Sequence, residues 1–255
     1  MKQLKQLLAE QVYFDVHYPI VETGFASIDK RIPLLRKGML SILGGRPGMG
    51  KTTLALQIAG QVAASGGTVA YFTQEGTSLE LSALLADIML IPSEPEMKLY
   101  FEDRIDTVQD LECAVYNLKH EPDLIIVDNL QEFKTIAENG ATCYHTGKVC
   151  RILKRIADKN RAAVLCTSKL TRAPDLRNNH WPNLNDIPNW DQFGWVIDYV
   201  CFLYREAYYN LECEHSELTE LYLARRVGTY HHFIGYLDQK WNGRTLHFSD
   251  EPYRE

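Results

Sequence analysis

Long apolar runs and a signal sequence are both missing from this chain of 255 residues. A helix needs about 18 or more consecutive apolar residues to cross a lipid bilayer, and no stretch approaches that length. The chain also does not open on the apolar core of a signal peptide. We therefore expect a cytoplasmic protein that makes no contact with a membrane.

Paired cysteines and an excess of positive charge are missing as well. The six cysteines include no C-x2-C pair, and several lie within apolar runs, as expected of buried free thiols in a reducing compartment. A metal site at Cys143, His145 and Cys150 is the alternative to this plain interpretation. The net charge of −6, from 27 basic and 33 acidic side chains, excludes a protein that coats nucleic acid by its overall charge. Any contact with nucleic acid must come from local patches.

One glycine-rich stretch dominates what the sequence does contain. An apolar run at residues 39–43 leads into the sequence GGRPGMGKT at residues 44–52, and a helical pattern follows. Glycines at this spacing let backbone N–H groups turn inward around phosphate oxygens, which a Cβ atom would obstruct. Lys51 offers a charge to the β- and γ-phosphates, and Thr52 offers a hydroxyl to Mg²⁺, at the positive end of the helix. The predicted nucleotide ligands are Gly45, Arg46, Pro47, Gly48, Met49, Gly50, Lys51, Thr52 and Thr53.

This pattern predicts a P-loop that binds ATP and Mg²⁺, with a glycine-rich turn as the alternative. Acidic residues end two further predicted strands: residues 68–73 lead to Glu75, and an aliphatic run at 124–127 leads to Asp128. Unbroken aliphatic runs are typical of parallel strands covered on both faces, whose carboxyl ends meet at one edge. We predict that Asp128 holds Mg²⁺ and that Glu75 orients or deprotonates the attacking water. A surface glutamate at a strand end is the alternative for Glu75.

The remaining pattern predicts an α/β fold, with a mainly parallel sheet and helices on both faces. Helices are expected at residues 52–64, 79–90, 108–120 and 149–159, and further strands at 100–105, 162–167 and 198–204. Alternation predicts a C-terminal β-hairpin at residues 218–227 and 233–237, and a closing strand at 244–248. Residues 133–144 and 171–195 are expected to be loops. We divide the chain into an N-terminal helix and connector, residues 1–20, and one ATPase domain, residues 21–255.

Short motifs extend well beyond the P-loop. In chain order they are Thr23-Gly24-Phe25 with Asp29, Gly45-Arg46-Pro47, Met49-Gly50-Lys51-Thr52, Phe72 with Glu75, Asp128 with Leu130 and Gln131, Leu153-Lys154, Leu170 with Arg172, and Phe202-Leu203-Tyr204-Arg205. In order and spacing they resemble the C-terminal ATPase domain of the replicative DnaB-like helicases, which has a RecA-like fold. By this resemblance, Glu75 is similar to the family's catalytic glutamate.

The resemblance implies a homo-oligomeric ring, expected to be a hexamer, that moves on single-stranded DNA. Within one subunit, the P-loop, Glu75 and Asp128 leave the outer face of the γ-phosphate without an arginine. The family supplies that arginine from the next subunit through a K-x-R pair, which Arg225 and Arg226 match loosely. A replication partner or loader is a further expected contact, although the sequence does not identify it.

Single-stranded DNA is expected to bind the polar segment at residues 171–195. Arg172 and Arg177 would contact phosphates, and Trp181, with Trp190 as a further candidate, would stack on bases. The alternative for the tryptophans is hydrophobic packing beneath a long loop. The sequence by itself leaves both interpretations open.

Several features depart from the family's pattern. Lys169 stands where the family has a glutamine that senses the γ-phosphate; this cation is predicted to bind phosphate but cannot make the same amide contact. Residues 189–195 differ from the family's E-S-G-x-x-E-Q segment near its DNA-binding loop. No counterpart of the family's N-terminal domain is found, so we expect a stand-alone ATPase domain. These departures bear on whether the protein separates DNA strands, not on whether it binds ATP.

Two classes of function follow from the sequence. The first is an ATP-dependent helicase or translocase motor, which the number of matched motifs favours. The second is a RecA-like ATPase switch that regulates a partner without unwinding DNA. The altered position 169, the acidic balance and the missing N-terminal domain favour the switch. A recombinase-like filament protein is a weaker third interpretation.

Overall fold

The computed structural model describes residues 3–6, 17–90, 97–210, 212–226, 229–241 and 245–250. Of the N-terminal helix and connector predicted at residues 1–20, only residues 3–6 and 17–20 lie within this set, and the division of the chain at residue 20 stays a prediction. No helix within the described ranges combines the length and the apolar character needed to cross a membrane.

The main sheet has nine strands among the described residues, in the order β11-β10-β9-β8-β1-β7-β4-β2-β3. Their bounds are Leu40–Gly45 (β1), Val69–Thr73 (β2), Leu99–Glu102 (β3), Leu124–Asp128 (β4), Ala163–Lys169 (β7), Tyr199–Tyr204 (β8), Leu218–Arg226 (β9), Thr229–Trp241 (β10) and Leu246–Asp250 (β11). The strands from β8 to β3 pair in parallel. Strands β9, β10 and β11 pair antiparallel. The mainly parallel sheet and the C-terminal hairpin are therefore confirmed.

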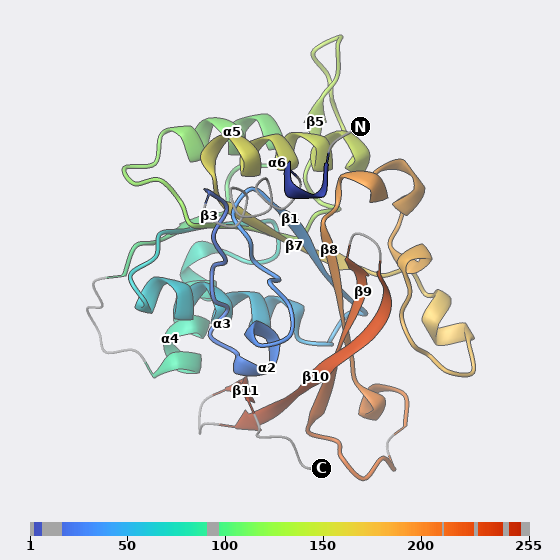
Figure 1. Cartoon of the computed structure of the whole chain (residues 1–255). Coiled ribbons are helices and arrows are strands. Elements are labelled where there is room, and N and C mark those ends of the chain that lie inside the picture. The colour runs from blue at the N-terminus through green and yellow to red at the C-terminus, as the bar shows by residue number, and fades with distance from the viewer. Residues whose placement is uncertain are drawn as a thin grey trace.

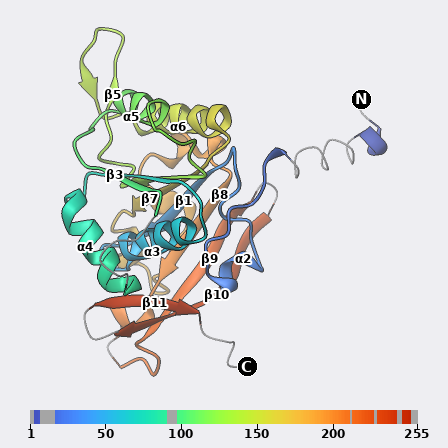
Figure 2. The same cartoon turned by 90° about the vertical axis from the view of Figure 1, so that its left-hand side faces the viewer.

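Helices cover both faces of this sheet, as predicted. Their bounds are Ala26–Asp29 (α2), Lys51–Ala64 (α3), Ser78–Met89 (α4), Val108–Tyr116 (α5) and Thr146–Asn160 (α6). Figure 1 shows α5 and α6 together above the sheet, with α2, α3 and α4 below it. The turned view in Figure 2 keeps the same two layers apart. Helix α5 ends four residues earlier than the predicted helix at 108–120.

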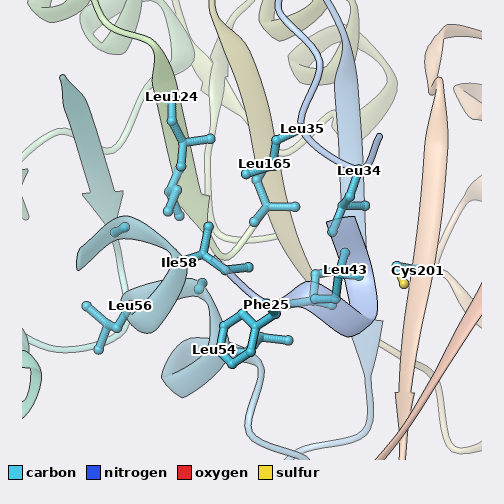
Figure 3. Close-up of a cluster of buried hydrophobic side chains, with 14 of the residues drawn as sticks. Phe25, Leu34, Leu35, Leu43, Leu54, Leu56, Ile58, Leu124, Leu165 and Cys201 are labelled. Atoms are coloured by element: carbon cyan, nitrogen blue, oxygen red, sulfur yellow. The ribbon is translucent and has the colours of Figure 1, made fainter. Parts of the chain in front are cut away.

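The two hydrophobic cores explain the unbroken aliphatic strands. Along β4, Leu124 and Ile126 belong to the core under α3 and α4, whereas Ile125 and Val127 belong to the core under α5 and α6. Successive side chains of a strand point to opposite faces, so a doubly covered strand needs apolar residues at every position. Figure 3 shows part of the first core, where Leu43, Leu165 and residues of α3 gather. Each fully buried leucine or isoleucine contributes about 1.5–3 kcal/mol.

The expected loop at residues 133–144 was partly wrong, because it contains a small hairpin. Strands β5 (Thr135–Ile136) and β6 (Thr142–Cys143) pair antiparallel, and the hairpin projects beyond α5 and α6 (Figures 1 and 2). Its turn contains Gly140 at φ +80°, preceded by Asn139. An Asn-Gly pair was therefore the available sequence signal. Residues 171–195 do form an irregular segment, with only short 3₁₀ turns, as expected.

Candidate nucleotide-binding site

The predicted site residues follow neighbouring strands at one edge of the sheet. The P-loop begins at the end of β1, Lys169 ends β7, Asp128 ends β4, and Glu75 lies just beyond β2. The registers place Gly45 beside Lys169 and Asp128 beside Thr73. Parallel α/β sheets bind ligands at the carboxyl ends of their strands, where the connections diverge. The fold therefore brings together functional groups that are spread over 125 positions of the sequence, from Gly45 to Lys169.

The P-loop joins β1 to α3 in a conformation suited to anions. Gly48 and Gly50 have φ values of +79° and +88°, in the left-handed region that favours glycine. Side chains cap the N-termini of α4, α5 and α6, but no side chain caps α3. The first N–H groups of a helix need partners, and a phosphate supplies them along with a charge that suits the helix dipole.

Lys51 is buried within this loop, with 8% of its surface exposed. Its ammonium donates a hydrogen bond to the carbonyl oxygen of Arg46 at 3.1 Å. Burial lowers the pKa of Lys51 to about 8, although the nearby charges of Glu75 and Asp128 oppose this shift. A polyphosphate next to the ammonium would favour its charged form. The residues present therefore fit a nucleotide phosphate chain.

Asp128 is the most deeply buried acid of the site, with 1% of its surface exposed. Its carboxylate accepts hydrogen bonds from the Tyr71 hydroxyl at 2.9 Å and from the Thr167 hydroxyl. Burial raises the pKa of Asp128, while hydrogen bonds from Thr167, Thr52 and Tyr71 oppose the shift. The contact with Thr52 brings together the hydroxyl and carboxylate oxygens that Mg²⁺ prefers. The donor set thus fits the predicted metal ion.

Glu75 lies beside these groups and is held by two donors. Its Oε1 atom accepts a hydrogen bond from the side-chain amide of Asn129 and forms an ion pair with the Lys169 ammonium. Asn129, Tyr71 and Thr167 were not among the residues predicted from sequence. Asn129 and Thr167 lie at the carboxyl ends of β4 and β7, and that position was the signal available for them.

Two side chains of the predicted nucleotide site are engaged elsewhere. Arg46 donates two hydrogen bonds to Asp175, at 3.0 and 2.6 Å, and a third to the carbonyl oxygen of Leu170 at 3.0 Å. Met49 is 1% exposed and packs into the hydrophobic core. The predicted contributions of Arg46 and Met49 are therefore confined to their backbones in this arrangement.

The three residues predicted to bind DNA differ in their exposure and in their hydrogen bonds. Arg177 makes two hydrogen bonds to Asp186, at 2.9 and 2.6 Å, and a third to the carbonyl oxygen of Trp181. The side chain of Arg172 is exposed and makes no hydrogen bond or ion pair within the described part of the chain, although its carbonyl oxygen accepts a hydrogen bond from the backbone N–H of Asp175 at 3.0 Å. Trp181 is 52% exposed and packs against the ring of Tyr222 at 5.6 Å. Arg177 has a structural role that the sequence did not predict, whereas Arg172 and Trp181 present accessible surface.

We expect Arg177→Ala to lower the free energy of unfolding by about 2–3 kcal/mol, because the carboxylate of Asp186 loses the cation that pairs with it. The Asp186 side chain is 2% exposed but that of Arg177 is 31% exposed. The cost should therefore lie at or just below the lower end of the range of about 3–5 kcal/mol for broken buried pairs. For a domain of this size the melting temperature should fall by about 4–12 °C. Arg172→Ala is the matched control and should leave the melting temperature within about 1 °C. Equal melting temperatures for both variants would contradict this assignment.

Arg225 and Arg226 occupy the end of β9, and their side chains lie outside what the structure describes. The backbone of Arg225 pairs with Val200, the second residue of β8. The P-loop follows the opposite, carboxyl ends of the parallel strands, roughly 13 Å further along β8. The backbone of Arg225 is therefore far from the P-loop of its own subunit.

The alternative metal site finds no support within the described ranges, which contain no group of three or more potential metal-binding His, Cys, Asp or Glu residues. The Nδ1 atom of His145 instead accepts a hydrogen bond from the backbone N–H of Lys148 at 3.3 Å and caps α6. Cys150 is buried in the hydrophobic core under α6. The plain structural interpretation fits these contacts.

Comparison with known families covers nearly the whole chain. The sequence profile of the DnaB-like helicase C-terminal domain matches residues 20–94 and 89–250. The chain belongs to this family. Membership in the DnaB-like family confirms the resemblance drawn from the short motifs. The family match begins one residue before the predicted ATPase domain.

Relatives of the DnaB-like family are named as replicative helicases. The chain is 27% identical to the replicative DNA helicase DnaB of Geobacillus stearothermophilus over 241 residues, covering 82% of this chain and 53% of the relative. It is 24% identical to the replicative DNA helicase DnaB of Haemophilus influenzae over 263 residues, covering 90% of this chain and 55% of the relative. The chain thus spans about half the length of these relatives.

Solved structures confirm the fold of the DnaB-like ATPase domain. A DnaB-like replicative helicase, described with its interactions with primase, superposes with a TM-score of 0.81 and 19% identity. The match covers 99% of this chain and 68% of the other. A separately solved ATPase domain gives a TM-score of 0.79 at 20% identity, covering 97% of this chain and 99% of that domain. The predicted RecA-like fold is therefore correct.

Proposed function

We propose that this chain is the ATP-hydrolysing motor of a replicative DnaB-type helicase and acts on single-stranded DNA in the cytoplasm. The observation that carries the proposal is the convergence of Lys51, Thr52, Asp128 and Glu75 at one sheet edge. A buried cation, an uncapped helix and two acids serve phosphoryl transfer better than a structural role. We also propose that the ATPase domain begins near residue 21, which the start of the family match supports.

Each predicted residue has a distinct task in this proposal. The P-loop backbone from Gly45 to Gly50, together with Lys51 and Thr53, binds the phosphates. Thr52 and Asp128 would hold Mg²⁺, which would supply positive charge to the phosphate chain. Glu75 accepts a proton from the attacking water, whose oxygen bonds to the γ-phosphorus as the bond to ADP breaks. Lys169 contributes a second cation.

We further propose that the site is completed across a subunit interface. Arg225 or Arg226 would reach the nucleotide of the neighbouring subunit, as an arginine that stabilises the charge of the transferred phosphoryl group. The strand register supports this, because the backbone of Arg225 is remote from the P-loop of its own chain. The proposed assembly is a hexameric ring, to which a replication partner or loader would bind.

A mixing experiment tests the ring. Arg225→Ala/Arg226→Ala protein and Lys51→Ala protein should each be inactive alone. In mixed rings, some interfaces combine an intact P-loop with an intact arginine, so part of the ATPase activity should return under conditions that allow subunit exchange. Steady-state ADP release over a series of mixing ratios measures the effect. Normal turnover by the arginine variant as a monomer would remove the case for a ring.

The DNA-binding proposal rests on the exposed pair Arg172 and Trp181. We expect the purified protein to displace a strand from a forked duplex in an ATP-dependent manner, and Arg172→Ala to bind single-stranded DNA less tightly. The slope of log affinity against log salt should flatten by about 0.7, because one phosphate contact is lost. Fluorescence anisotropy measures the affinity for single-stranded DNA and its salt dependence, with Lys159→Ala as the control. DNA-independent ATPase activity without strand displacement would favour the partner-regulating switch.

A further inference from the structure

Lys169 is held firmly at the edge of the nucleotide site. It is the last residue of β7 and lies beside Gly45, the last residue of β1. Its backbone N–H donates to Oε1 of Gln131 at 3.2 Å, and its carbonyl oxygen accepts from Nε2 of the same side chain at 3.2 Å. Gln131, which follows β4, thereby holds the backbone of residue 169 in place and limits where the ammonium of Lys169 can reach.

The ammonium of Lys169 lies between two carboxylates. It pairs directly with Oε1 of Glu75 and is 3.6 Å from Oε1 of Glu132. The contact with Glu75 raises the pKa of Lys169 and so favours its charged form. Asn129 donates to the same Glu75 oxygen. The carboxylate proposed to act on water is therefore occupied by a cation in this arrangement.

A third phosphate would compete with Glu75 for that cation. Lys51 is the residue that we expect to contact the β- and γ-phosphates. It lies close enough to Glu75 and Lys169 that the charge of Glu75 raises its pKa and the charge of Lys169 lowers it, alongside the larger effect of burial. A γ-phosphate near Lys51 carries more negative charge than a carboxylate, so at equal distance it attracts the ammonium of Lys169 more strongly than Glu75 does. ADP has no γ-phosphate, so it leaves the pair of Lys169 and Glu75 intact.

We propose that the ion pair of Lys169 with Glu75 is a latch, which keeps the carboxylate away from the attacking water. ATP breaks this ion pair, whereas ADP does not. This inference rests on the proposed function, since it assigns a control step to the same site. While latched, Glu75 is held by Lys169 and Asn129. When the γ-phosphate takes the ammonium, the carboxylate becomes available to the attacking water. Lys169 is thus a positioning residue, and a neutral amide at position 169 forms no such ion pair.

The expected size of the effect follows from exposure. The side chains of Lys169 and Glu75 are 41% and 32% exposed, so water and salt screen their attraction. Ion pairs of this kind change an equilibrium by about two- to fivefold. A coupling of that size is measurable by titration calorimetry, provided that both partners are varied together.

A double-mutant cycle on nucleotide affinity tests the latch. Wild type, Lys169→Gln, Glu75→Gln and the double variant are titrated with Mg²⁺ and either AMP-PNP, which is not hydrolysed, or ADP. If AMP-PNP breaks the pair, the double variant should bind it about two- to fivefold less tightly than the product of the two single effects. The same cycle with ADP should be additive. A purely structural role for Lys169 would shift both nucleotides alike.

Glu132→Gln provides the matched control, because it removes an equal charge from the longer contact with Lys169. Its cycle with Lys169→Gln should show a smaller coupling than the Glu75 cycle with AMP-PNP, because this contact is longer, and should be additive with ADP. Additive behaviour in the Glu75 cycle with AMP-PNP, while both nucleotides still bind, would overturn the latch and leave the proposed function standing. Failure of the wild type to bind either nucleotide would overturn both. Melting curves of all variants report whether each is folded.

Discussion

Replacing Lys51 by alanine is expected to abolish ATP hydrolysis, with a loss of about 10²–10³-fold or more. The alanine removes the cation that is 8% exposed inside the P-loop, so the charge of the β- and γ-phosphates is left uncompensated. Nucleotide affinity should fall for the same reason. Initial rates of phosphate release and calorimetric binding of ADP measure the two effects separately.

Folding is expected to survive this substitution. Burial lowers the pKa of Lys51, which means that the folded protein disfavours its charged form, and the ammonium donates only one hydrogen bond among the described contacts. The melting temperature of the nucleotide-free protein should therefore stay within a few degrees of wild type. Lys159→Ala, on α6 and across the sheet, is the matched control and should keep full turnover. Undiminished hydrolysis by Lys51→Ala would remove the foundation of the proposed function.

Replacing Glu75 by glutamine is expected to reduce hydrolysis by about 10²–10⁴-fold while nucleotide binding persists. The amide keeps the shape of the side chain, and its oxygen still accepts the hydrogen bond from Asn129, but it cannot take a proton from water. AMP-PNP should bind at least as tightly as to wild type, because Lys169 is no longer paired with a carboxylate. Single-turnover hydrolysis and equilibrium binding together distinguish lost chemistry from lost affinity.

Glu132→Gln is the comparison for this second variant. Glu132 lies 3.6 Å from Lys169, yet it follows a different strand and does not share the hydrogen bond from Asn129. Its amide variant should retain most of the hydrolysis rate. If Glu75→Gln and Glu132→Gln turn over ATP equally fast, Glu75 is only a residue at the end of a strand.

The parts of this protein that the sequence predicted well are those encoded by contiguous residues. The P-loop requires glycines, a lysine and a threonine in one short run, and its backbone angles at Gly48 and Gly50 match that requirement. The aliphatic run before Asp128 identified a strand buried on both faces, because only such a strand needs apolar residues at every position. The end of a parallel strand then located the acid at the sheet edge.

The elements that the sequence missed depend on weaker local signals. The hairpin of β5 and β6 contains only two paired residues on each strand, too few for a periodic pattern. Its buried Thr135 accepts a hydrogen bond from Gln109, a residue of α5 that is distant in the sequence. The irregular segment at 171–195 was recognised as such, but its internal contacts were not.

The sequence by itself determined the fold class, the P-loop and the positions of Glu75 and Asp128, because each is a property of one short segment. Only the tertiary structure decided which charges meet. It paired Arg177 with Asp186, Arg46 with Asp175, and Lys169 with Glu75. Ion pairs form between any acid and base that the fold brings within reach, so 27 basic and 33 acidic residues allow many pairings. The selection among them comes from strand order and loop path, which no local pattern encodes.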